Sequence, residues 1–177
     1  MRLFLAIALA QDVSKTLLSY QPAVAEGIRL VDKGQLHLTL HFLGDEEPKK
    51  IEAALAKLQF TAFTIELEGV GTFKGGRGSS VLWAGVRLSD ALVDLYEQLG
   101  TLLAEAGILL KPQRYRPHIT LARCKKAYGE ENVRRFLQTK TKLLENSVDS
   151  FQLYASVRDD PGSDSATPHY KVLSQYK

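Results

Sequence analysis

The feature that most constrains the fold is a four-residue pattern that occurs twice, each time within a short apolar alternation. The first copy is HLTL at residues 37–40, and the second is HITL at residues 118–121. Successive side chains of a β-strand point to opposite faces, so each copy places its histidine and threonine on one face and its aliphatic residues on the other. We therefore expect two strands that each have one face against a core and one face carrying a histidine and a threonine.

The same order of elements surrounds each copy. Strand, helix, short segment, motif strand, helix and strand follow one another over residues 1–72 and again over 81–157, and 169–176 adds a last strand. Such repetition predicts two similar half-domains. Because sequential strands lie too close in the chain for parallel crossovers throughout, we expect an α+β fold. Residues 1–177 are predicted to form a single bilobal domain, with two pseudo-symmetric lobes of antiparallel sheet and helices around a central cleft.

Hydrophobic periodicity and end signals place the helices. The predicted helices cover residues 12–25, 47–59, 90–106 and 130–140. Asp12 is the candidate N-cap of the first helix, and Gly107 ends the third. Residues 148–157 and 169–176 are predicted as the last two strands.

The N-terminus, MRLFLAIALAQD, imitates a short secretion signal. Its apolar run from Leu3 to Ala10 is at the short end for such a signal and is far below the roughly 20 residues that span a bilayer. We interpret it as a buried strand and expect no membrane association. Cys124 is the single cysteine, which excludes an intramolecular disulfide and favours a reducing compartment, so we expect a cytoplasmic protein. Without heptads or a long apolar stripe, we expect a monomer.

Positive charge is concentrated around the second motif. Residues 111–126 contain six basic residues and no acidic one. The whole chain has 23 basic and 20 acidic residues, so the rest of the chain has 17 basic residues and a net charge of −3. This placement favours an anionic substrate.

The two motifs suit phosphate chemistry. The unperturbed pKa of histidine, about 6.5, lies near working pH, so His37 and His118 can divide the work of a general acid and a general base. The hydroxyls of Thr39 and Thr120 can donate hydrogen bonds to phosphate oxygens. No nucleophilic serine or cysteine is needed, and no metal is needed if the leaving group is protonated directly.

Together, RLFLAIAL, HLTLHFLG, VLWAGV and RPHITLAR resemble the two-histidine phosphoesterases, and within them the RNA 2′,3′-cyclic phosphodiesterases, also called 2′-5′ RNA ligases. The resemblance covers nearly the whole chain. It implies hydrolysis of RNA 2′,3′-cyclic phosphate ends to 2′-phosphates without metal or cofactor, together with the reverse joining reaction. It also implies that His37 is the proton donor to the ribose 3′-oxygen and that His118 is the proton acceptor for water.

The resemblance further implies that Thr39, Thr120 and Arg123 hold the phosphate and that Phe42 stacks on the terminal base. Phe42 and Arg123 each lie five residues after a motif histidine. In a regular strand this odd offset points them away from the histidine face. Each therefore needs a β-bulge or the end of its strand to reach the cleft.

Three further residues have competing interpretations. His41 forms H-x₃-H with His37, but four residues of strand span about 13 Å, too far for one metal ion. We interpret His41 as a residue of the cleft rim or surface. For Trp83 we favour core packing over a place in the cleft wall. Tyr170 is an additional candidate for the cleft, because the end segment of the family passes near it.

Two other functions stay open. The motifs could bind phosphate at RNA ends without turnover, or they could act on small cyclic phosphates instead of RNA. The basic segment fits all three hypotheses, because each ligand is an anion. Turnover separates the enzymes from the binding module, and substrate size separates the two enzymes.

Overall fold

The computed structural model describes residues 2–157 and 168–177. Its strands are β1 (Arg2–Ala8), β2 (Ile28–Leu30), β3 (His37–Gly44), β4 (Phe63–Lys74), β5 (Ser80–Val86), β6 (His118–Cys124), β7 (Leu144–Val148), β8 (Phe151–Val157) and β9 (His169–Tyr176). Its α-helices are α1 (Gln11–Ser19), α2 (Pro48–Leu55), α3 (Asp90–Glu105) and α4 (Gly129–Phe136). Short 3₁₀ turns occur at Lys33–Gln35, Gly76–Gly78 and Lys126–Tyr128.

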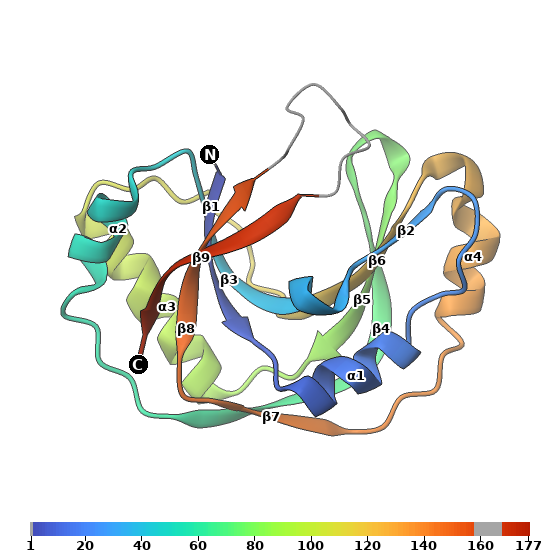
Figure 1. The fold of residues 1–177 in the computed structure, drawn as a ribbon, viewed down its shortest axis with the longest axis horizontal. Helices are drawn as coiled ribbons and strands as arrows, with labels where there is room; N and C mark the ends of the chain where they lie inside the picture. The colour runs from blue at the N-terminus through green and yellow to red at the C-terminus, as the bar shows by residue number, and fades with distance from the viewer. Residues whose placement is uncertain (1, 158–167) are drawn as a thin grey trace.

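The two motif strands lie side by side in the middle of an antiparallel sheet. The strand order is β7-β4-β5-β6-β3-β1-β8-β9, and β2 pairs with the remaining part of β6. The strands β3 and β6 are joined by a single residue pair, Leu38 with Ile119. In Figure 1, β1, β8 and β9 lie on the left, β5 and β6 lie on the right, and β7 crosses the bottom of the view. The predicted α+β fold with two antiparallel sets of strands is confirmed.

The halves of the chain exchange elements. Strand β4 follows the first motif but pairs with β5, whereas β8 follows the second motif but pairs with β1. The helices do the same, since α3 packs against β3 and α1 packs against β7. Figure 1 shows α3 beside α2 on one flank and α4 on the other. Each set of strands therefore depends on both halves of the chain.

The core covers the face of the sheet that carries the aliphatic motif residues. Leu38, Leu40, Ile119 and Leu121 are at most 1% exposed. Burying each such side chain stabilises the fold by about 1.5–3 kcal/mol, which determines the face that each motif strand turns inward. Residues 3–7 of β1 are buried as well, which confirms the interpretation of the N-terminal apolar run as a strand.

The first helix differs from its prediction at both ends. It ends at Ser19 instead of residue 25. Pro22 disfavours a helical conformation of Gln21, which accounts for the early end. The N-cap is Ala10, and Asp12 lies in the first turn, so the prediction of an Asp12 cap is wrong.

Other boundaries also shift. Helix α3 agrees with its prediction and begins after Ser89, whose side chain accepts a hydrogen bond from the backbone of Leu92. Helices α2 and α4 are shorter than predicted. The strand predicted over residues 148–157 is confirmed as β8 but begins at Phe151, and a separate strand with a different partner, β7, ends at Val148. None of the helices in the described residues is long and apolar enough to cross a membrane.

Candidate active site

A β-bulge in β3 decides which of its side chains share the histidine face. Leu40 has no partner of its own in the pairing of β3 with β1. Leu40 and His41 are consecutive buried residues, so the alternation changes face between them. Phe42 lies five residues after His37 and would point to the other face of a regular strand. The bulge returns it to the face of His37 and Thr39.

Strand β6 has a bulge at the equivalent position. Leu121 has no partner of its own in β5. Leu121 and Ala122 are both buried, and Arg123 returns to the face of His118 and Thr120. The predicted condition for Phe42 and Arg123 to reach the cleft is therefore met in both motif strands.

A cavity of about 530 Å³ lies where the motif strands meet. This volume is within the range of roughly 300–1,000 Å³ that is typical of small-molecule sites. All six residues that the sequence indicated line it, namely His37, Thr39, Phe42, His118, Thr120 and Arg123. Arg2 and Arg29 line it too, and its described lining contains no acidic residue, so the cavity is suited to an anion.

The same backbone contact holds each motif histidine. His37 Nδ1 lies 2.7 Å from the carbonyl oxygen of Gln35, and His118 Nδ1 lies 2.7 Å from that of Arg116. A carbonyl can only accept, so we assign the Nδ1 proton to both rings. The Nε2 atom of each ring is therefore the one available to take up and release a proton.

Burial lowers the pKa of both histidines below the ordinary value of 6.5. The carbonyl contacts oppose this effect and raise the pKa of each ring. The charge of His118 further lowers the pKa of His37, and the charge of Arg123 further lowers that of His118. The two imidazoles are thus electrostatically coupled, and His118 has the permanent cation as its neighbour.

Aromatic rings form the walls around both histidines. The ring centroids of Phe4 and Tyr170 lie 5.0 and 5.2 Å from that of His37. The ring of Phe73 lies 4.8 Å from His118 in an edge-on arrangement. These rings exclude water and account for the lowered pKa of both imidazoles. Tyr170, the additional candidate for the cleft, lines the cavity.

Phe42 differs from these wall residues because 65% of it is exposed. Its ring centroid is 6.2 Å from that of Phe4. The ring of Phe42 lines the cavity while most of the side chain is open to solvent, so a planar group in the cavity can stack on it. Phe42 therefore offers a stacking surface next to the histidine pair.

Sequence reasoning missed Arg29, which lies opposite Arg123 in the pairing of β2 with β6. The signal that could have identified it is a basic residue in the short segment before the first motif. The core packing favoured for Trp83 is wrong, because Trp83 is only half-buried and packs with its ring 4.9 Å from Phe73. It does so on the cleft side of β5, since its ring is 6.3 Å from His118 and its neighbours Leu82 and Ala84 are buried in the core.

The interpretation of His41 as a rim or surface residue is wrong. His41 is 5% exposed. Its Nε2 donates to the carbonyl oxygen of Tyr96 at 2.8 Å, and its ring stacks on Tyr96 at a centroid distance of 4.1 Å. The bulge turns His41 toward α3, and burial lowers its pKa. Among residues 2–157 and 168–177, no group of His, Cys, Asp or Glu is arranged to hold a metal ion.

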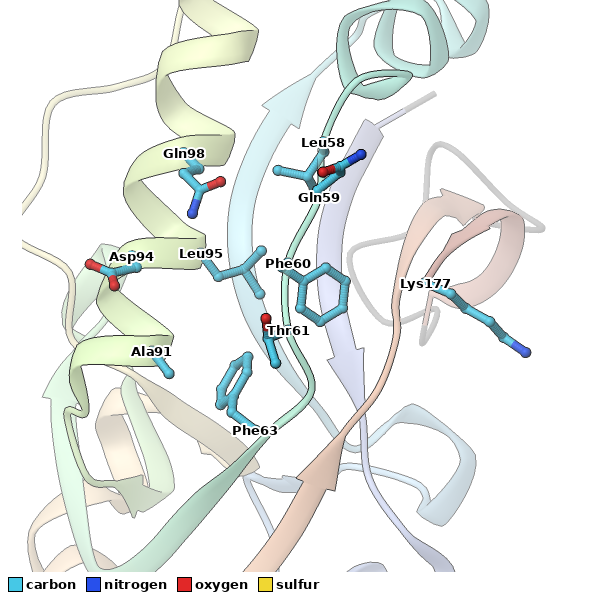
Figure 2. A pocket seen from close by; sticks show the side chains of 10 residues that line it. All are labelled: Leu58, Gln59, Phe60, Thr61, Phe63, Ala91, Asp94, Leu95, Gln98 and Lys177. Atoms are coloured by element: carbon cyan, nitrogen blue, oxygen red, sulfur yellow. The ribbon is translucent and has the colours of Figure 1, made fainter.

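A separate hollow of about 600 Å³ lies between α3 and residues 58–63. Figure 2 shows Phe60 and Phe63 on one side of it and Leu95 of α3 on the other. Its charged residues, Asp94 and Lys177, point away from these rings (Figure 2). Its described lining contains no histidine, cysteine or arginine, and Asp94 and Lys177 do not point toward one another (Figure 2), so it lacks a converging pair of acid–base groups.

Comparison with known proteins gives consistent results. The model of the 2′-5′ RNA ligase superfamily matches residues 12–160. The RNA 2′,3′-cyclic phosphodiesterase of Thermotoga maritima is 31% identical over 98% of this chain and 93% of its own length. The protein of the same name from Archaeoglobus fulgidus is 29% identical over 100% of both chains. The crystal structure of Escherichia coli LigT complexed with 3′-AMP matches with a TM-score of 0.75 at 25% identity, covering 99% of this chain and 96% of that chain.

Proposed function

The chain belongs to the 2′-5′ RNA ligase superfamily, and we propose that it hydrolyses RNA 2′,3′-cyclic phosphate ends to 2′-phosphomonoesters. One observation carries the proposal. Two coupled histidines, each with Nδ1 held by a backbone carbonyl, line one cavity with cationic side chains and no acidic residue in the described lining. Such a cavity can bind a phosphodiester and exchange protons with it at two positions.

In the proposed reaction, Nε2 of His118 takes a proton from water as the water oxygen bonds to phosphorus. The bond between phosphorus and the ribose 3′-oxygen breaks, and Nε2 of His37 gives its proton to that oxygen. The products are a 2′-phosphate and a free 3′-hydroxyl. Exchange with solvent then returns a proton to His37 and removes one from His118. The reverse sequence joins a cyclic phosphate end to a 5′-hydroxyl, by microscopic reversibility.

The charged neighbours support the roles that the resemblance implies. Arg123 lowers the pKa of His118, which favours the neutral form that a general base needs. His37 has no such permanent cation among the causes of its shift. A bound phosphate raises the pKa of His37, because an anion favours the protonated ring, and this prepares His37 as the acid.

In the proposed complex, the four remaining predicted site residues hold the substrate. The hydroxyls of Thr39 and Thr120 donate to non-bridging phosphate oxygens, and the guanidinium of Arg123 neutralises the phosphate charge. Phe42 stacks on the terminal base, an interaction that contributes about 1–3 kcal/mol. We also propose that the protein is a monomer and that it is cytoplasmic, and the single buried cysteine, Cys124, supports the reducing compartment.

The test uses a short RNA with a 2′,3′-cyclic phosphate end, excess EDTA, and separation of 2′- from 3′-phosphate products. We expect 2′-phosphate only. His37→Ala and His118→Ala should each lower kcat by about 10²-fold or more, the usual contribution of general acid–base catalysis. His169→Ala is the matched control, because His169 is an exposed histidine outside the cavity lining.

Other outcomes point elsewhere. A near-normal rate in either variant, with its unfolding transition intact, refutes the catalytic role of that histidine. Binding of the RNA without turnover favours a module that binds RNA ends. Turnover of nucleoside cyclic phosphates but not of RNA favours a phosphodiesterase for small cyclic phosphates.

A further inference from the structure

A second cavity of about 290 Å³ adjoins the first. The two share Thr39, Phe42, Phe73 and His118, so they meet at the reacting centre. Residues 113–116 supply most of the remaining lining of the second cavity, including Arg114 and Arg116. The described lining contains no acidic residue, and its two guanidiniums suit a second anion.

Residues 113–116 occupy the place in the second half of the chain that β2 occupies in the first. Each segment lies between the first helix of its half and the motif strand. Strand β2 brings Arg29 opposite Arg123 in the first cavity. In the second half, the hydroxyl of Tyr115 lies 3.4 Å from the carbonyl oxygen of Thr39, so this segment lies against β3. Both segments therefore carry arginine to the cleft, one into each cavity.

A stack of three rings anchors residues 113–116. The Tyr115 ring lies 3.9 Å from that of Tyr96 in a parallel arrangement, and Tyr96 stacks in turn on the buried His41. Burial strongly raises the pKa of Tyr115, so its hydroxyl stays protonated and available to donate to Thr39. This stack limits the movement of the backbone between Tyr115 and His118.

Arg116 and Arg114 are placed differently on this anchored backbone. The carbonyl of Arg116 holds His118, and its guanidinium lies 5.9 Å above the ring of Phe73. Arg116 is thus tied to the catalytic centre. Arg114 is exposed and lines the second cavity but not the first. It can therefore contact a negative charge that neighbours the reacting phosphate.

We propose that the second cavity is a subsite for the phosphodiester on the 5′ side of the terminal nucleotide, with Arg114 as its cationic contact. The inference rests on the proposed function. The cyclic phosphate and the next phosphodiester of an RNA are attached to the same ribose. Phe42 lines both cavities, so a terminal nucleoside on Phe42 has its cyclic phosphate in the first cavity and its 5′ phosphodiester in the second. This subsite makes the enzyme favour an RNA chain over a mononucleotide.

The test compares two dinucleotides with the same 2′,3′-cyclic phosphate end. One has an ordinary phosphodiester between its nucleosides, and the other has a neutral methylphosphonate. In the wild type we expect kcat/KM to be about fivefold higher for the charged dinucleotide, as an exposed, charge-assisted contact allows. Arg114→Gln should bring this ratio close to one. Arg135→Gln on α4 removes an equal charge outside both cavities and should retain the ratio.

Two results overturn the subsite alone. The first is a wild-type ratio near one, and the second is an Arg114→Gln variant that loses activity on both dinucleotides by the same factor. A wild-type protein that hydrolyses neither dinucleotide refutes the proposed function, and the inference fails with it. Thermal unfolding of each variant confirms that the comparison is between folded proteins.

Discussion

Equivalent backbone contacts hold His37 and His118, but their charged neighbours differ. In both rings the carbonyl two residues earlier accepts from Nδ1. His118 has Arg123 beside it, whereas His37 has the other histidine. A near-symmetric pair of motifs can therefore support two different proton roles, because one permanent cation is enough to separate the protonation of two similar imidazoles.

The lowered pKa values predict the pH dependence of kcat/KM. The base works above its pKa and the acid works below its pKa, and both free-enzyme values lie below 6.5. We expect kcat/KM to be maximal below pH 6.5 and to fall by about tenfold per unit well above it, because His37 loses its proton. The falling limb of kcat should lie at higher pH, since bound phosphate raises the pKa of His37. Initial rates between about pH 4.5 and 8.5 measure both profiles.

Stability must be followed over the same pH range. His37, His41 and His118 have a lower pKa in the folded protein than in the unfolded chain. The unfolded chain therefore binds more protons as the pH falls below 6.5, and the free energy of unfolding decreases in that direction. Unfolding transitions at each pH separate this loss from catalysis. A kcat/KM that still rises between about pH 7 and 8 contradicts the assignment.

At the level of elements, pairs of strands position the residues behind the catalytic face. Strand β4 carries Gly71 opposite Trp83 of β5. A β-carbon at Gly71 would lie 2.1 Å from the Trp83 ring, so only glycine leaves room for the indole. The indole packs on Phe73, and Phe73 packs on His118. A change at Gly71 can thus reach His118 through two ring contacts.

Gly71→Ala should destabilise the protein by about 1–3 kcal/mol, because the indole must shift in a packed layer. We also expect a fall in kcat, since the displaced ring presses on Phe73 and His118. Urea denaturation and steady-state rates measure the two effects. Gly76→Ala is the control, because a β-carbon there meets nothing within 4 Å and should change stability by less than about 0.5 kcal/mol. Equal behaviour of the two variants contradicts this role of Gly71.

At the scale of the whole molecule, positive charge gathers at the cleft, and among residues 2–157 and 168–177 no acidic residue lines either cavity. Arginines from four segments line the two cavities, at positions 2, 29, 114, 116 and 123. Acidic residues pair with other arginines outside them, as Glu66 and Glu68 do with Arg87. A net charge of only +3 therefore conceals a strongly cationic cleft, which steers an anionic chain toward the histidines.

This charge distribution predicts a salt dependence that grows with the length of the substrate. Each phosphate that releases counterions adds about 0.7 to the slope of log affinity against log salt for a single strand. We expect kcat/KM to fall more steeply with salt for a cyclic-phosphate RNA of several nucleotides than for the mononucleotide. Steady-state rates over a salt series measure both slopes. Equal slopes would mean that charges beyond the reacting phosphate do not contribute to binding.

The sequence by itself determined the features that depend on local periodicity. The two H-x-T-L copies predict two strands with one face of histidine and threonine and one aliphatic face, and the structure has both strands, at β3 and β6. Helix α3 also follows from its apolar spacing and from its end at Gly107. These features need only neighbours along the chain, because side-chain direction in a strand or helix repeats with a fixed period.

Only the tertiary structure decided which residues join the histidines. Each bulge arises from the register between a motif strand and its partner, which a single strand does not specify. The bulges bring Phe42 and Arg123 into the cavity and turn His41 into the core. The pairing of β2 with β6 likewise places Arg29 beside Arg123 across a long stretch of chain. Contacts between distant segments set these positions, so the periodicity of a single strand does not determine them.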